Sequence, residues 1–219
     1  MQHLLDFILH LDRHLADLVQ AYGPWIYGLL FGIILAETGF VVTPFLPGDS
    51  LLFATGALAA GEGGLNAWLL FGLLTVAAFL GDNINYAIGR AIGPRIFRGT
   101  GTSGWFSRML NREHLNRAHE FFEQYGGKAV ILARFAPILR TFVPFVAGAA
   151  SMTPRTFVLY NAVGAAAWVG LCLGAGVAFG NVPIVKNNFS LVTVGIVLVS
   201  LIPVAVEVMR ARAKRPPAA

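Results

Sequence analysis

Residues 65–89 read LNAWLLFGLLTVAAFLGDNINYAIG, and this stretch decides the class of protein. A helix of this length, rising about 1.5 Å per residue, is about 37 Å long. It can therefore cross the hydrocarbon layer of a bilayer, which is roughly 30 Å thick. A second apolar block, residues 191–206, is nearly long enough to do the same. The core of a soluble protein would need polar helix faces that both blocks lack, so we expect an integral membrane protein.

The composition of the whole chain agrees with this expectation. Of 219 residues, 56% are hydrophobic and 12% are charged, about half the charged fraction of soluble domains. The formal charge is +5, and the basic residues gather between Arg90 and Lys128 and in the tail 210–219. Basic loops stay on the cytoplasmic side of a membrane. We therefore expect a cytoplasmic loop 90–127 and cytoplasmic N- and C-termini. Nucleic-acid binding fits poorly, because these charges flank membrane segments.

Two amphipathic helices are expected outside the spans. In residues 1–21, apolar side chains recur at spacings of three and four, which favours a helix lying at the membrane interface. His10 and His14 share a face of that helix but have no third ligand, so we expect no metal site there. A second amphipathic helix is expected over residues 110–125. The single cysteine, Cys172, lies in an apolar block, and we interpret it as a packing residue.

Two apolar segments, about 38–62 and 128–151, are interrupted by proline and glycine. A straight helix does not accommodate such residues, and broken backbone at membrane depth needs protein or a water-filled cavity around it. We expect both segments to be re-entrant hairpins. Unbroken spans are expected at residues 25–36, 65–89, 157–179 and 191–209. The predicted fold is thus an all-α polytopic membrane protein, with about four transmembrane helices, two hairpins and a single membrane domain over residues 22–209.

The basic segments also orient the hairpins. With the basic loop and the tail both inside, the first hairpin enters from outside and the second from inside. Opposed broken elements are typical of transporters built from inverted repeats, whose sites lie near the bilayer midplane. An internal repeat is also suggested at an offset of 91 residues, where Asp49-Ser50 aligns with Arg140-Thr141.

Five ionisable residues fall inside or at the edge of apolar blocks: Glu37, Asp49, Asp82, Arg134 and Arg140. Each costs at least about 2.5–3.5 kcal/mol at membrane depth, and such residues usually mark transport pathways or proton relays. Structural ion pairs that hold the hairpins together are the alternative, and one residue can serve both purposes.

Residue chemistry suggests a role for each of these side chains. A low-dielectric site favours the neutral form of a carboxylate, so Glu37 and Asp49 are candidates for carrying protons. The arginine side chain stays charged, and its planar fork matches phosphate oxygens. Arg134 and Arg140 are therefore candidates for binding an anionic lipid headgroup.

The role of Asp82 stays open at this point. It lies near the end of its span, beside Arg90, and either a transport role or a helix-end polar network with Asn83 and Asn85 would explain it.

The leading hypothesis from these residues is a transporter of an anionic substrate, with protons as the coupling ion. A membrane enzyme would need a nucleophile paired with histidine, or a metal cluster. The apolar segments contain no histidine, and His114 and His119 lie five apart on the basic loop. We therefore expect no enzyme activity, cofactor or metal. An exporter of small cations or drugs and a non-transporting assembly factor remain alternatives. The direction of transport, coupling by H⁺ or Na⁺, and a homo-oligomer also stay open.

The run Arg134-Phe-Ala-Pro-Ile-Leu-Arg140, followed by Pro144 and Ala147-Gly148, resembles the signature of the DedA family. This family belongs to the superfamily of SNARE-associated Golgi or VTT-domain proteins. Further matching residues are Glu37, Pro47-Gly48-Asp49, Gly81-Asp82, Tyr86, Gly89 and Arg90. The resemblance covers roughly residues 20–185.

The resemblance implies a bacterial inner-membrane protein with two opposed hairpins. Members are implicated in moving lipids between leaflets, including undecaprenyl phosphate, with a dependence on the proton gradient or membrane potential. Two acids and two arginines are required in the family, and they match Glu37, Asp49, Arg134 and Arg140 here. A supporting role is expected for Pro47, Gly48, Asp82, Tyr86, Arg90, Pro137, Pro144 and Gly148.

Overall fold

The computed structural model describes residues 22–39, 48–61, 65–97 and 125–180, together with the single positions 182, 183, 185, 192 and 195, and this part of the chain is helical. Its helices are α3 (Trp25–Gly39), α4 (Gly48–Ala60), α5 (Ala67–Phe97), α8 (Lys128–Ala133), α9 (Pro137–Ala149) and α10 (Pro154–Phe179). The predicted all-α class is confirmed for these residues. Outside the described residues lie the predicted interfacial helix 1–21, Pro47, the predicted helix 110–125 except Tyr125, and the predicted span 191–209 except positions 192 and 195.

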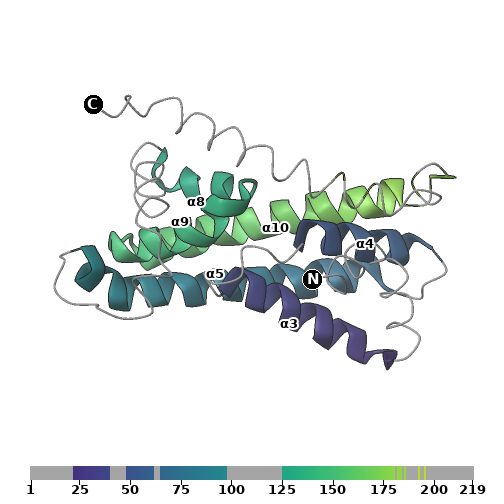
Figure 1. The fold of residues 1–219 in the computed structure, drawn as a ribbon, viewed down its shortest axis with the longest axis horizontal. Helices are drawn as coiled ribbons and strands as arrows, with labels where there is room; N and C mark the ends of the chain where they lie inside the picture. Colours follow the sequence, from purple (N-terminus) through teal and green to yellow (C-terminus); the bar gives the residue numbers. More distant parts are fainter. Residues whose placement is uncertain are drawn as a thin grey trace, which may run out of the picture.

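Helices α5 and α10 pack against each other and run along the length of the molecule (Figure 1). Their apolar parts, Ala67–Ile92 and Pro154–Phe179, are 26 residues each, or about 39 Å. Both are long enough to cross a bilayer. Large apolar side chains stand exposed on them, including Trp68 (84% exposed) and Leu159 (64%). Such faces suit contact with lipid tails.

Two helix boundaries differ from those predicted. Helix α3 continues through Glu37 to Gly39, so the predicted break at residue 38 begins later. Helix α5 continues past Gly89 to Phe97, so the start of the predicted basic loop 90–127 is helical. Polar and basic residues are acceptable helix formers, and a membrane helix can therefore extend beyond its apolar span.

Helices α4 and α9 are short, at 13 residues each. Each is about 20 Å long, less than the thickness of the hydrocarbon layer. Within the predicted hairpin 128–151, α8 ends at Ala133, Ala136 has extended backbone, and Pro137 begins α9. The predicted interruption is therefore present. Entry of the two short helices from opposite membrane faces stays a prediction.

The described helices fall into two halves, α3–α4–α5 and α8–α9–α10. In each half, a 13-residue helix (α4 or α9) comes before a long helix (α5 or α10). The 13-residue helix of each half packs on the long helix of the other half, α4 on α10 and α9 on α5. Four glycines allow these crossings: Gly56 and Gly176 between α4 and α10, and Gly89 and Gly148 between α5 and α9. At each of them, a Cβ atom would collide with a backbone carbonyl of the opposite helix. This exchange of partners supports the predicted internal repeat.

The buried apolar side chains form two clusters. One contains residues of α3, α4, α5 and α10. The other joins α8 and α9 to Tyr86 of α5 and Phe157 of α10. Both long helices therefore contribute to each cluster, so the two halves are not separate folding units.

Candidate functional site

Three helices converge on Arg140, which lies in the first turn of α9. Its guanidinium donates from Nη2 to the Glu37 carboxylate at the end of α3, and from Nη1 to Asp49 Oδ1 of α4 at 3.0 Å. The side chains of Arg140 and Glu37 are 8% and 0% exposed, whereas that of Asp49 is 22% exposed. We call these three residues the Arg140 site. Asp49 and Arg140, aligned by the 91-residue offset in the sequence, are thus in direct contact.

Gly48 places the end of α3 against the beginning of α4. Its backbone amide hydrogen-bonds the Glu37 carboxylate, and the N-terminus of a helix carries partial positive charge that favours an anion. A Cβ at Gly48 would collide with that carboxylate. A larger residue at position 48 would therefore displace the Glu37 carboxylate from its place in the Arg140 site.

Trp168 of α10 is a member of the site that the sequence did not reveal. Its Nε1–H donates to Asp49 Oδ1 at 2.8 Å, and the Arg140 Cζ atom lies 5.3 Å from the ring centroid. That distance is within the range of a cation–π interaction. In the sequence, Trp168 is one of several aromatic residues in apolar segments, and no signal separates it from a tryptophan that faces lipid, such as Trp68.

Arg134, at the end of α8, has a different set of partners. Its Nη2 donates to Asp82 Oδ2 of α5 and to Asn161 Oδ1 of α10, each at 2.5 Å, and lies 3.4 Å from the Ala78 carbonyl oxygen. Asn161 also donates to the Phe79 carbonyl at 3.0 Å. The side chains of Arg134 and Asp82 are both 4% exposed. We call Arg134, Asp82 and Asn161 the Arg134 site.

The structure corrects the neighbourhood predicted for Asp82. Its partner is Arg134 and not Arg90, which is exposed and lies with Nη1 3.4 Å from the Tyr86 hydroxyl. The Asn83 amide donates to the Phe79 carbonyl, and the Asn85 amide donates to the Thr141 carbonyl. These two residues therefore do not form the alternative polar network with Asp82. Asp82 and Arg90 are eight residues apart on one helix, which separates them by about 12 Å.

The remaining predicted residues lie at the crossing of α5 and α9. The Tyr86 hydroxyl donates to the Met152 carbonyl, and its ring stacks on Phe157 with centroids 4.2 Å apart. Gly148 abuts the Tyr86 carbonyl. Pro144 lies inside α9, where it cannot donate to the carbonyl of Arg140 one turn earlier. These contacts hold α9 against α5, and Arg140 lies in the first turn of α9.

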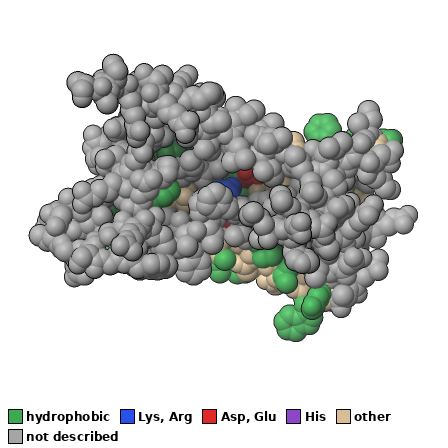
Figure 2. Space-filling model, viewed as in Figure 1, with side chains coloured by type: hydrophobic (Ala, Val, Ile, Leu, Met, Phe, Trp, Pro, Cys, Tyr) green, Lys and Arg blue, Asp and Glu red, His purple; other side chains and the backbone are tan. Residues whose placement is uncertain are grey.

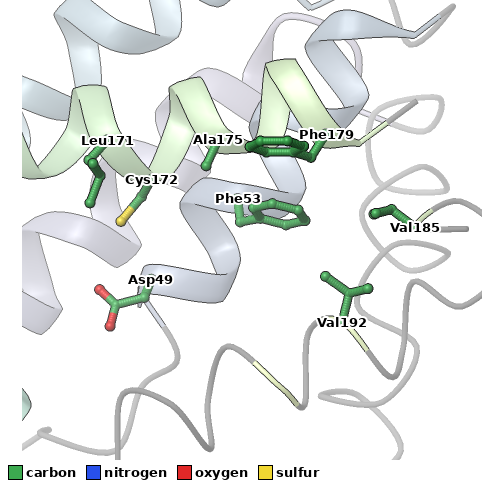
Figure 3. Close-up of a pocket in the computed structure, with 8 residues that line it drawn as sticks. All are labelled: Asp49, Phe53, Leu171, Cys172, Ala175, Phe179, Val185 and Val192. Atoms are coloured by element: carbon green, nitrogen blue, oxygen red, sulfur yellow. The ribbon is translucent and has the colours of Figure 1, made fainter. Parts of the chain in front are cut away.

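A pocket of about 380 Å³ opens beside the Arg140 site (Figure 3). It lies between α4, α10 and the two residues Val185 and Val192. It is lined by Asp49, Phe53, Leu171, Cys172, Ala175, Phe179, Val185 and Val192. Figure 3 shows Asp49, Leu171 and Cys172 at one end of the pocket and Val185 and Val192 at the other, with the remaining apolar residues between them. Among the described residues of this lining, Asp49 is the single charged one.

The Arg140 and Arg134 sites together contain unequal numbers of acids and bases. The two sites contain three carboxylates and two guanidinium groups, so they hold one more acid than base. Figure 2 shows basic and acidic atoms meeting near the middle of one face of the molecule. In such surroundings an extra negative charge is costly, and it is readily balanced by a proton or a cation.

Comparison with known proteins places the chain in a family. The model of the VTT domain matches residues 46–178, which include four of the five charged residues described above. Protein DedA of Escherichia coli K12 is 50% identical over 208 residues, covering 94% of this chain and 93% of the relative. An uncharacterized membrane protein of Mycobacterium tuberculosis is 41% identical over 84% of this chain and 79% of its own length.

The inner membrane protein YghB of Escherichia coli K12 is 31% identical over 84% of this chain and 78% of its own length. No solved structure matches the chain. The extent of the match to the domain model and the identity to DedA agree with the motifs around Arg134 and Arg140. The chain therefore belongs to the DedA family of VTT-domain proteins and is a bacterial inner-membrane protein.

Proposed function

We propose that this protein is a proton-dependent transporter that moves an anionic lipid across the inner membrane. The observation that carries the proposal is the sharing of Arg140 between two carboxylates from two other helices, next to an apolar pocket. One carboxylate is enough to balance the charge of Arg140. A second one adds a negative charge that a proton can neutralise.

In the proposed cycle, protonation of Glu37 or Asp49 weakens its ion pair with Arg140. The guanidinium can then bind the phosphate group, because its planar fork of N–H donors matches the phosphate oxygens. Loss of the proton restores the ion pair and displaces the headgroup. Proton and anionic lipid would therefore move together.

Arg134 is a further candidate for the phosphate. In the described part of the chain, the Nε atoms of Arg134 and Arg140 are buried and have no hydrogen-bond partner, so each arginine retains a donor. For Arg134, binding also requires that Asp82 or Asn161 yield one of its existing bonds. We therefore expect Arg140 to bind the headgroup first.

The pocket supports a substrate with an apolar chain. Seven of its eight lining residues are apolar or weakly polar, and Asp49 connects it to the Arg140 site. A hydrocarbon tail in the pocket would bring the headgroup of the same molecule to Arg140. Undecaprenyl phosphate and phospholipids both combine a hydrocarbon chain with a phosphate headgroup.

One observation favours a second candidate, an exporter of lipophilic cations. Asp49 is the charged residue of the pocket lining, and the two sites hold an excess of acid. An apolar pocket that ends in a carboxylate can bind an organic cation in exchange for a proton.

Transport in proteoliposomes distinguishes these functions. The purified protein would be tested with a fluorescent polyisoprenyl phosphate, a fluorescent phospholipid and tetraphenylphosphonium, with and without a pH gradient. We expect movement of an anionic lipid that depends on the gradient and falls to the level of protein-free vesicles in Arg140→Ala. The matched control is Arg155→Ala, since Arg155 is exposed at the start of α10.

Equal lipid movement by folded Arg140→Ala and wild-type protein would contradict the proposal. Gradient-dependent movement of tetraphenylphosphonium alone would establish the cation exporter instead.

A further inference from the structure

Trp168 contacts both the acid and the base that the proposed function pairs. Its side chain, 2% exposed, donates a hydrogen bond to Asp49 Oδ1 and offers its ring face to Arg140. The described contacts thus give one indole two different partners of opposite charge. A buried indole N–H needs an acceptor in any case, but here the acceptor is a carboxylate that also pairs with the arginine under the ring.

The oxygen that accepts from Trp168 also accepts from Arg140. Asp49 Oδ1 lies 2.8 Å from the indole nitrogen and 3.0 Å from Arg140 Nη1. A carboxylate oxygen accepts two such bonds while it is ionised. Protonation of Asp49 weakens both of them, whereas the cation–π contact between Trp168 and Arg140 is unaffected by that proton. When Asp49 is protonated, Arg140 therefore keeps its contact with the Trp168 ring as well as its ion pair with Glu37.

We propose that Trp168 is the positioning residue of the coupling site: its N–H orients the Asp49 carboxylate, and its ring holds Arg140 in place while Asp49 is protonated. The inference rests on the proposed function, because it assigns proton binding to Asp49. It adds a residue from α10, so the site joins α3, α4, α9 and α10.

Several other ionisable groups surround this contact. They are Glu37 on α3, Asp82 on α5, Arg134 at the end of α8, Arg140 on α9 and Cys172 one turn after Trp168 on α10. Glu37 is the nearest competitor for a proton, because it pairs with the same guanidinium as Asp49. The test must therefore separate Asp49 from Glu37.

The first experiment uses the fluorescence of Trp168. The chain contains four tryptophans, and replacing Trp25, Trp68 and Trp105 with phenylalanine leaves Trp168 as the reporter in the otherwise complete protein. We expect its emission to change with pH along a single titration curve. The change should vanish in Asp49→Asn, which keeps a side-chain oxygen as acceptor but does not titrate, and should persist in Glu37→Gln. A flat emission, or an unchanged titration in Asp49→Asn, would overturn the proposal.

The second experiment measures the pH profile of transport in Trp168→Phe, which keeps an aromatic ring but lacks the N–H donor. Loss of a hydrogen bond to the charged carboxylate should move the midpoint of the profile upward by about one pH unit. The control, Trp68→Phe, removes an exposed indole and should leave the midpoint unchanged. A lower rate with the wild-type midpoint would indicate packing only and would overturn the inference. If wild-type protein moves no lipid, the proposed function fails, while the emission titration still decides the role of Trp168.

Discussion

The two buried arginines lie in the same fold six residues apart, yet their surroundings differ. Arg134 has one carboxylate partner and also donates to the side-chain oxygen of Asn161, and neither Arg134 nor Asp82 is among the described residues that line the pocket. Arg140 is shared by two carboxylates, one of which lines the pocket. The Arg134 site is balanced in charge, whereas the Arg140 site contains one acid more than base.

This difference separates two uses of buried charge. A balanced pair with fixed neutral partners holds helices together, and removing one member leaves an uncompensated charge. An unbalanced site changes its bonding when a proton arrives. We therefore expect variants of the Arg134 site to lose stability and variants of the Arg140 site to lose transport or its coupling.

The largest expected effect on stability follows from Arg134→Ala. Asp82 would be left buried without its cation, and the free energy of unfolding should fall by about 3–5 kcal/mol. Thermal unfolding in detergent should shift down by roughly 10 °C. Adding Asp82→Asn should restore part of that loss, and Arg155→Ala should show no shift. If Arg134→Ala unfolds at the wild-type temperature, Arg134 does not stabilise the fold, and the proposed difference between the two sites is wrong.

A smaller loss is expected from Gly148→Ala at the crossing of α5 and α9. The new Cβ would collide with the Tyr86 carbonyl and lie 2.8 Å from the Arg90 nitrogen. Overpacking of this kind costs about 1–3 kcal/mol, which the same thermal unfolding would measure. Gly72→Ala, where nothing lies within 4 Å, is the matched control. Gly56→Ala should resemble Gly148→Ala, because Gly56 occupies the corresponding crossing of the other half.

The smallest effect on stability, with a clear effect on function, is expected from Glu37→Gln. Glutamine has nearly the same shape and can still accept a bond from Arg140, so the fold should be retained. It cannot bind and release a proton at this position. Lipid movement should become equal with and without a pH gradient, while movement down a lipid gradient continues. Retained acceleration by the pH gradient would exclude Glu37 as the proton carrier and leave Asp49.

Much of this arrangement could be predicted from the chain alone. The apolar parts of α5 and α10, the interruption before Pro137 and the five ionisable residues of the two sites follow from local composition, because the cost of placing polar groups in lipid acts on each segment separately. Gly56, Pro144 and Gly148 do not interrupt the backbone, since they lie inside α4 and α9. The offset of 91 residues also identified Asp49 and Arg140 as corresponding positions, and these two residues are in contact. Helix boundaries were less well predicted, as the extension of α5 to Phe97 shows.

The sequence by itself thus determined that this is a helical membrane protein and which ionisable residues its apolar segments carry. The tertiary structure decided the partners. Arg134 pairs with a residue 52 positions away, Arg140 with residues 91 and 103 positions away, and Asp49 with Trp168 at a separation of 119. Hydropathy is a property of contiguous residues, whereas an ion pair depends on where distant helices cross. Those crossings are set by glycine contacts and side-chain packing, which no single segment specifies.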